Sequence, residues 1–225
     1  MTASPPEVGQ VASPPEARGP ILVWDIPTRL FHWSLVLCFV IAYLTSESER
    51  WQVWHVTAGY VFGLLLLFRL VWGVIGTRYA RFSNFVRGPK VVMSYVGSLL
   101  TRHPQHFVGH NPAGAWAIVA MIVLGLLAVL AGWASFNDYG DWFGGLHEGL
   151  INVLLLVVAV HVSGVLVSSV LHRENLVRAM VNGHKQGRPD EAIRYPQLIV
   201  GVVLVLGVAA FLWALLSSRL PALLP

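Results

Sequence analysis

Four histidines have the side chain and the spacing needed to bind metal-containing cofactors inside a bundle of membrane helices. Each lies in or at the edge of an apolar segment long enough to cross a bilayer. Two of them are 14 residues apart, close to four helical turns, so their side chains share one helix face with a rise of roughly 21 Å between them. Imidazole is an axial ligand of haem iron, and one helix with two such ligands can serve two stacked haems. The four are His32 and His55, and the pair on one helix, His147 and His161.

The composition indicates that a lipid bilayer surrounds most of the chain. Of the 225 residues, 56% are hydrophobic and only 12% are charged, whereas soluble domains carry about 25% charged residues. The net charge of +4 does not indicate a nucleic-acid partner, because the basic residues lie between the apolar segments. The single cysteine, Cys38, excludes an internal disulfide and a C-x-x-C-H haem attachment site, and we expect it to be an apolar filler.

Five apolar segments are near the length of about 20 residues that a bilayer requires. The expected fold is therefore all-α: a transmembrane four-helix dihaem bundle with one additional C-terminal transmembrane helix. We expect a disordered, proline-rich tail over residues 1–20, a dihaem membrane domain over 21–185, and a linker with the fifth helix over 186–225. The expected spans are residues 30–44, 53–75, 113–133, 146–171 and 198–216.

Lysine and arginine residues predict the orientation of the chain. Twelve of them fall in the tail and in the connections after the second and fourth spans, whereas Arg50 and Arg219 fall on the other side. By the positive-inside rule, the N-terminus is expected inside and the C-terminus outside. The outer loops are acidic, either as a consequence of the same rule or to steer a basic soluble partner. The acidic residues are Glu47, Glu49, Asp138, Asp141 and Glu148.

This orientation sorts the four histidines by depth. His32 and His161 lie toward the inner side of the membrane, and His55 and His147 lie toward the outer side. Two imidazoles that face each other across a bundle can fill both axial positions of one haem, so depth predicts one inner and one outer haem. A histidine at a membrane surface is often only hydrated, but His161 lies in mid-span, where an ionisable residue is functional by default.

Several ordered motifs resemble those of one family. The chain over roughly residues 20–185 resembles the prokaryotic cytochrome b561 and nickel–iron hydrogenase b-type cytochrome family. The fifth span and the proline-rich tail lie outside this resemblance. The motifs are VWDIPTRLFHW (23–33), WHVTAGYVFG (54–63), FRLVWGVIG (68–76), GHNPAGAW (109–116), LHEGLINVLLLVVAVHVSGVLVSS (146–169) and HRENLVRAM (172–180).

The resemblance implies a dihaem bundle of the bacterial inner membrane that passes electrons between the quinone pool and a partner redox protein. The axial histidines of the family match His32, His55, His147 and His161, in the pairing that depth also predicts. The implied cofactors are two haem b groups, with a quinone as a further ligand. The partner is left open between a hydrogenase-like enzyme and a c-type cytochrome. No catalytic residue is expected, because the iron carries the chemistry.

Other residues are candidates for contacts with the cofactors. Gly59 and Gly63 are four residues apart on the second span, which permits the close approach of a helix or of a flat macrocycle. Gly164 can make similar room beside the mid-span histidine. Arg29 and Arg69 are candidate partners for the anionic propionates of the inner haem. The alternative for Arg69 is snorkelling to the inner surface.

A quinone needs an apolar slot with a polar group to hydrogen-bond its carbonyl. His110 and Asn111 are candidate donors on the inner side. His110 also clusters with His103 and His106, where a metal site is the alternative to a solvated loop. His172 lies about three turns beyond the mid-span histidine and is an alternative ligand for the inner haem.

Two other functions are left open by the sequence. The chain could be a membrane anchor that recruits a redox enzyme, or a transporter that relays protons through its histidines. The lack of inverted repeats and of broken helices with acidic residues at the midplane counts against a transporter. Two amphipathic stretches, residues 91–100 and 174–181, are expected at the inner interface, and His184 is expected to be solvated.

Overall fold

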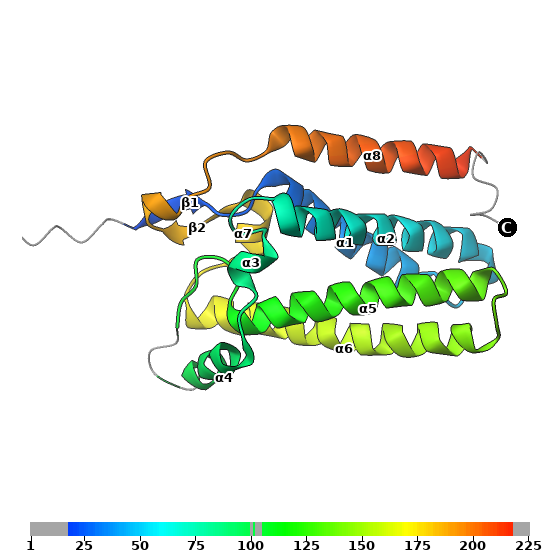
Figure 1. Cartoon of the computed structure of the whole chain (residues 1–225), viewed down its shortest axis with the longest axis horizontal. Coiled ribbons are helices and arrows are strands. Elements are labelled where there is room, and N and C mark those ends of the chain that lie inside the picture. Colours follow the sequence, from blue (N-terminus) through cyan, green and yellow to red (C-terminus); the bar gives the residue numbers. More distant parts are fainter. Residues whose placement is uncertain (1–17, 100, 102–104, 218–225) are drawn as a thin grey trace, which may run out of the picture.

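The five expected membrane helices are all present in the computed structural model, which describes residues 18–99, 101 and 105–217. Figure 1 shows them as long helices that run side by side. Within the described residues, five helices are long and apolar enough to cross a membrane, so the predicted spans and the all-α bundle are confirmed. The helices are α1 (Ile26–Leu44), α2 (Gln52–Ile75), α5 (Pro112–Phe136), α6 (Trp142–Leu171) and α8 (Leu198–Leu216).

The first span is longer than expected, because it starts at Ile26 rather than at residue 30. Pro27 fits in the first helical turn, where the missing backbone N–H has no helical acceptor. Asp25 caps the helix by accepting a hydrogen bond from the Thr28 N–H at 2.7 Å. The resulting helix of 19 residues is close to the length that spans a bilayer.

Shorter elements connect the long helices, and most of them lie at one end of the bundle (Figure 1). This end carries the connections that the charge pattern predicts to be inside, and we refer to it as the inner end. The elements are β1 (Gly19–Leu22), η1 (Glu49–Trp51), α3 (Phe82–Phe85), α4 (Pro89–Ser98), α7 (Leu176–Asn182), β2 (His184–Gly187) and η2 (Pro189–Glu191).

The two amphipathic stretches expected at the inner interface form helices α4 and α7. Helix α7 begins after Asn175, whose Oδ1 accepts a hydrogen bond from the Arg178 N–H at 2.8 Å. Gly19 and Pro20, expected in the tail, are instead part of strand β1. Other expectations fall on residues outside the described part of the chain: the tail over 1–17, residue 100, Arg102, His103 and Arg219.

Helix α2 lies at the centre of the bundle, because two of its faces pack against different neighbours. One face forms a hydrophobic cluster with α1 and α8, and the other forms a cluster with α5 and α6. The fifth membrane helix therefore has a structural role, as one wall of the first cluster. The first cluster contains Phe31, Val61, Leu65 and Leu204, and the second contains Phe62, Leu66, Ile122 and Leu154.

Glycines set the closest helix contacts. A Cβ on Gly125 of α5 would lie 2.8 Å from Leu66 Cδ1 of α2, and a Cβ on Gly201 of α8 would lie 2.7 Å from Ile26 Cγ2 of α1. A real Cβ essentially never lies that close to a neighbouring carbon, so a larger residue would push these helices apart.

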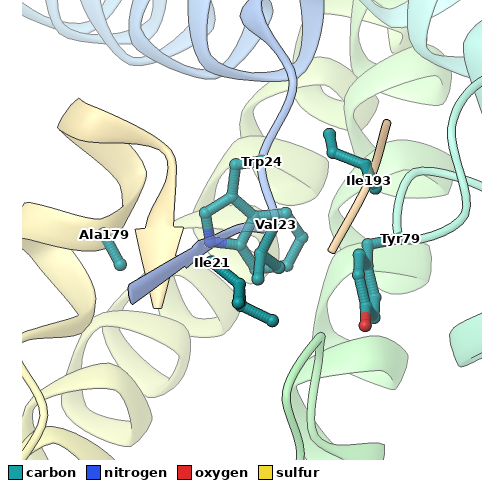
Figure 2. Close-up of a cluster of buried hydrophobic side chains, with 6 residues drawn as sticks. All are labelled: Ile21, Val23, Trp24, Tyr79, Ala179 and Ile193. Atoms are coloured by element: carbon teal, nitrogen blue, oxygen red, sulfur yellow. The ribbon is translucent and has the colours of Figure 1, made fainter. Parts of the chain in front are cut away.

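A two-stranded ribbon at the inner end is the part of the fold that the sequence did not predict. Strands β1 and β2 are antiparallel, and their pairing runs from Gly19 with Gly187 to Leu22 with His184. The ribbon crosses the expected boundary between residues 185 and 186, and it joins the start of the membrane domain to the linker before α8. Figure 2 shows the hydrophobic cluster beside it, which contains Ile21, Val23, Trp24, Tyr79, Ala179 and Ile193.

Asp25 is a buried polar node at the inner end, and the sequence did not single it out. Its side chain has no exposed surface. Besides capping α1, the carboxylate accepts hydrogen bonds from Trp72 Nε1 at 3.2 Å and from the Thr77 hydroxyl. A buried carboxylate is stable only when its oxygens are hydrogen-bonded, and here the donors come from α1, from α2 and from the turn after α2.

We expect Asp25→Ala to lower the free energy of unfolding by about 3 kcal/mol, because it removes the cap of α1. It also leaves Trp72 Nε1 and the Thr77 hydroxyl without their acceptor. The measurement is thermal unfolding of the detergent-solubilised protein. Asp141→Ala is the matched control, since Asp141 is exposed and precedes α6 without a capping hydrogen bond. The control should change stability by less than about 0.5 kcal/mol, and equal effects of the two variants would contradict the assignment.

Candidate functional site

The two outer histidines face each other across the bundle. His55 lies in the first turn of α2 and His147 in the second turn of α6. Their ring centroids are 6.1 Å apart, and the ring planes are inclined by 82°. The structure thus brings together the two residues that depth paired from the sequence.

A backbone carbonyl on a neighbouring helix fixes each outer imidazole. His55 Nδ1 lies 2.8 Å from the Ala42 carbonyl oxygen of α1, and His147 Nδ1 lies 2.8 Å from the Ala128 carbonyl oxygen of α5. A carbonyl only accepts hydrogen bonds, so both Nδ1 atoms must carry the proton. In a neutral imidazole held this way, Nε2 presents a lone pair, which is the form of histidine that ligates a metal.

Local features of the sequence explain why the Ala42 and Ala128 carbonyls are free to accept these hydrogen bonds. Ala42 lies in the last turn of α1, where carbonyls lack complete helical partners. On α5, the glycine one turn beyond Ala128 leaves the carbonyl open, because a Cβ on Gly132 would lie 2.8 Å from His147 Nδ1. Sequence reasoning missed these residues, and the available signal was the row of small residues Gly125, Ala128 and Gly132 along one face of α5.

The two inner histidines lie deeper in the bundle and are both half-buried. His32 is near the start of α1, and its Nδ1 is shielded from solvent with no hydrogen-bond partner among the described residues. His161 lies in the inner half of α6. Both act electrostatically on His110, whose pKa is lowered well below its usual value by burial and further by Arg69, Lys185, His161 and His32. The inner pair and His110 therefore share one region of the structure.

Arg69 and His110 are packed on the same aromatic ring. The Arg69 guanidinium carbon lies 4.7 Å from the Phe82 ring centroid and 5.6 Å from that of Phe85. The His110 ring lies 4.5 Å from Phe85 and 4.6 Å from Trp24, measured between centroids. Arg69 is only 3% exposed, so the alternative of snorkelling to the surface is wrong. His110 is not a solvated loop residue either, because its Nδ1 is shielded from solvent.

These residues fit a haem at two kinds of position. Polar atoms shielded from solvent and lacking a partner within the described residues include Arg69 Nη1, Arg29 Nε and His32 Nδ1, and anionic propionates suit the two arginines. A Cβ on Gly59, one turn past His55, or on Gly164, three residues past His161, would have no heavy atom within 4 Å. These glycines leave open space beside the two histidines.

Other predicted site residues have partners of their own. A Cβ on Gly63 would lie 3.0 Å from Val129 Cγ1, so this glycine serves the packing of α2 on α5. The Arg29 guanidinium donates through Nη1 to the Val181 carbonyl oxygen at 2.7 Å. Asn111 caps α5, because its Oδ1 accepts from the Gly114 N–H at 2.7 Å.

The remaining histidines are not arranged as a metal centre. His106 and His172 face each other with centroids 5.2 Å apart, and His184 is exposed, as expected. Among the residues that the structure describes, no three histidine, cysteine or acidic side chains are close enough to hold a bare metal ion. The sequence left open a metal site formed by His103, His106 and His110. Within residues 105–111, the part of this segment that the structure describes, such a site is not supported.

An ionic cluster beside His172 joins the segment after α6 to the ribbon. Glu174 accepts a hydrogen bond from the Gln186 N–H at 2.9 Å and lies 3.3 Å from the buried Lys185 Nζ. His106 Nε2 is 3.7 Å away. Burial raises the pKa of Glu174, but the nearby His106 ring, the hydrogen bond from the Gln186 N–H and the charge of Lys185 have a larger opposite effect and lower the pKa to about 2.

Comparison with known proteins identifies the family. Residues 23–183 match the family model described as prokaryotic cytochrome b561. Similar proteins include probable Ni/Fe-hydrogenase B-type cytochrome subunits from Rhodobacter capsulatus (22% identity, 77% of this chain and 84% of the relative) and Azotobacter vinelandii (26%, 76% and 91%). The Escherichia coli K12 hydrogenase 1 subunit is 22% identical over 72% of this chain and 89% of its own length. No solved structure gives a significant match.

The family match covers more than half of the chain, so the chain belongs to the prokaryotic cytochrome b561 family. Members of this family are membrane proteins that bind b-type haem. The five membrane helices and the facing pair of His55 and His147 agree with this assignment, and the resemblance inferred from the motifs is confirmed.

The lowered pKa of Glu174 predicts how this cluster depends on pH. Because the folded pKa of about 2 lies below the ordinary value of 4.5, its stabilisation is complete above pH 4.5 and is lost as the pH falls toward 2. We expect Glu174→Gln to reduce the free energy of unfolding by about 1.5 kcal/mol at pH 7. Measured by thermal unfolding, the difference in the free energy of unfolding between wild type and Glu174→Gln should become smaller below pH 4.5.

The control for this prediction is Glu49→Gln, at an exposed position in η1, which should leave stability unchanged at both pH values. If the difference in the free energy of unfolding between wild type and Glu174→Gln stays constant from pH 7 to pH 3, the lowered pKa of Glu174 is contradicted.

Proposed function

We propose that this member of the prokaryotic cytochrome b561 family is a dihaem b-type cytochrome that relays electrons across a bacterial inner membrane, between the quinone pool and a partner redox protein. The observation that supports it best is the outer pair, in which His55 and His147 both have Nδ1 bonded to a carbonyl and Nε2 left as the ligating atom. This arrangement fits an iron with two imidazole ligands, which cycles between its ferric and ferrous states without binding oxygen.

The chain would hold the two haems through ligands on three helices. His55 of α2 and His147 of α6 bind at the outer site, and His32 of α1 and His161 of α6 bind at the inner site. Because α6 supplies one ligand to each site, it fixes the spacing of the two irons. Arg69 would pair with an inner propionate, and the unpartnered Nε of Arg29 is a second donor. Gly59 and Gly164 keep side chains off the macrocycle faces.

A quinone would bind at the inner side, close to His110. Its Nδ1 is a shielded polar atom with no partner in the described part of the chain, and aromatic rings cover the imidazole on two sides. Asn111 would contribute only its Nδ2, since its Oδ1 caps α5. This combination of an apolar surround and a free donor suits a quinone carbonyl.

The partner is proposed to be a hydrogenase-like enzyme. Its support is that the similar proteins are described as probable Ni/Fe-hydrogenase B-type cytochrome subunits. A c-type cytochrome is the alternative partner. With the N-terminus cytoplasmic and the C-terminus periplasmic, such a partner would approach the acidic periplasmic side beside the outer haem.

Haem stoichiometry tests the ligand assignment. The purified protein should contain two b-type haems per chain, and His161→Ala should reduce this to one or fewer, measured by the dithionite-reduced minus oxidised spectrum and by haem content per chain. His184→Ala changes an exposed histidine of β2 and should keep both haems. No haem in an intact, membrane-inserted preparation would overturn the electron-transfer proposal in favour of an anchor or a transporter.

The space beside Gly59 gives a second test. Gly59→Leu should halve the haem content while the protein still inserts and folds, because a Cβ at this position meets no protein atom within 4 Å and the side chain would occupy the space of the outer macrocycle. Gly207→Leu is the matched control on α8, where a Cβ also meets nothing within 4 Å, and it should keep the full haem content. Full haem in Gly59→Leu would show that the macrocycle lies elsewhere.

A further inference from the structure

We propose that the chain binds one anionic phospholipid of the inner leaflet, with an acyl chain in a hollow between α2, α3 and α5 and the phosphate on Arg81 and Arg87. This inference goes beyond the proposed function and does not depend on it, because neither haem nor quinone takes part. It is carried by an apolar hollow, by unpaired cations at its inner end, and by a hydrogen bond that fixes one of these cations in place.

The hollow opens on the lipid-facing side of the bundle. Its volume is about 410 Å³, within the range of roughly 300–1,000 Å³ that is typical of ligand pockets. Ser83 is the one polar residue among the described residues that line it. The hollow therefore suits a hydrocarbon chain. Its walls include Leu70 of α2, Phe82 of α3, Val86, and Val119 and Val123 of α5.

The hollow lies in the inner half of the membrane. Helix α5 starts at Pro112 at the inner end, and Val119 and Val123 are seven and eleven residues further along it. At 1.5 Å per residue, these positions are roughly 10 and 16 Å from the inner end. Half of the hydrocarbon core of a bilayer is about 15 Å thick, so the hollow is at the depth of the acyl chains of the inner leaflet.

Exposed cations adjoin the inner end of the hollow. Arg81 directly precedes Phe82, and Arg87 directly follows Val86, so each is the neighbour of a wall residue. Neither arginine forms an ion pair with any residue in the part of the chain that the structure describes. The connection over residues 76–99 contains four basic side chains and no acidic one. A basic pocket between membrane helices on the inner side suits an anionic phospholipid headgroup.

The acidic side chains that reach solvent at the inner end are engaged elsewhere, among the residues described. Glu174 lies 3.3 Å from Lys185 Nζ. Asp190 and Glu191 lie 3.1 and 3.9 Å from Arg188 Nη2. No protein carboxylate is therefore left to neutralise the two arginines beside the hollow, whereas a phosphate group from the membrane can do so.

An indole holds Arg87 next to the hollow. Trp116 Nε1, in the second turn of α5, donates to the Arg87 carbonyl oxygen at 2.8 Å. Tryptophan is enriched at the membrane–water interface, which is the level of the headgroups. Lys90, in the first turn of α4, adds another exposed cation at this level. Because the hydrogen bond fixes the backbone before a lipid binds, less entropy is lost when the site is occupied.

A quinone tail is the other hydrocarbon chain that a membrane offers to this hollow. The phospholipid is favoured, because a quinone is neutral and would leave both arginines unpaired. Phe82 also stands between the hollow and the inner site: its ring centroid lies 4.7 Å from the Arg69 guanidinium carbon. The same ring leaves no room for a Cβ on Gly73 of α2. A bound acyl chain would cover the lipid-facing side of the ring and support its packing on α2.

Native mass spectrometry of the purified, delipidated holoprotein tests this inference. The probes are dioleoyl phosphatidylglycerol, which is anionic, and dioleoyl phosphatidylcholine, which is zwitterionic and has the same chains. One phosphatidylglycerol should bind per chain, roughly tenfold or more tightly than phosphatidylcholine. Dihexanoyl phosphatidylglycerol should bind roughly tenfold or more weakly than the dioleoyl form, because it buries fewer methylene groups. Equal binding of the two dioleoyl lipids, or of the short-chain and long-chain forms, would overturn the inference.

The two arginines give the first site-specific test. Arg81→Gln with Arg87→Gln should weaken phosphatidylglycerol binding by about 25-fold, since each basic side chain near an anionic headgroup contributes about fivefold. The control is Arg178→Gln with Arg194→Gln, which removes the same charge from two other exposed arginines of the inner end and should keep the wild-type affinity. All four arginines are exposed, so both double variants should fold, which thermal unfolding checks.

The hollow itself gives the second test. Val123→Trp fills the hollow and should weaken phosphatidylglycerol binding by roughly tenfold. Val203→Trp is the matched control on α8, where the side chain is 61% exposed, and it should bind the lipid as wild type does. An excess of decyl-ubiquinone should not displace the lipid. Displacement by the quinone, or unchanged lipid binding in Val123→Trp or in the Arg81 and Arg87 double variant, would overturn the inference and leave the proposed function intact.

Discussion

A bilayer interior offers no water to hydrogen-bond polar groups, so each polar atom at membrane depth must find a partner in the protein or in something that the protein binds. This constraint organises the structure. Ala42 and Ala128 supply carbonyls to the outer imidazoles. Asp25 satisfies donors from three segments at the inner end. Arg69 Nη1 has no partner in the described part of the chain, and an anionic group of a bound cofactor would satisfy it.

The two ends of the bundle solve this problem differently. At the outer end the helices meet through short turns, and backbone carbonyls of small residues hold the imidazoles of His55 and His147. At the inner end the ribbon, α3 and α7 form a cap over the helix termini (Figure 1). The cap joins distant segments by contacts such as that between Arg29 and Val181 and by the cluster in Figure 2. Helix α6 runs between both ends, with His147 near the outer end and His161 in its inner half.

Small residues matter as much as the histidines. Gly132 opens the Ala128 carbonyl to His147, Gly63 and Gly125 bring α2 and α5 together, and Gly59 leaves space one turn from His55. These glycines are alike in the sequence, and each has a different neighbour. Close helix packing and room for a flat cofactor are competing uses of the same residue type, and the neighbouring helix decides between them.

The sequence by itself determined the five spans and the pairing of His55 with His147, and it predicted the pairing of His32 with His161, because segment length and the helical period are local properties of the chain. Only the tertiary structure decided which carbonyls hold His55 and His147, and that Arg69 and His110 both lie against the Phe85 ring. The β1–β2 ribbon was equally hidden, since its second strand, HKQG, has no apolar alternation to predict it. These features join residues that are far apart in the chain. The local hydrophobic pattern that predicts a helix does not indicate which backbone carbonyl or aromatic ring of another segment a side chain will contact.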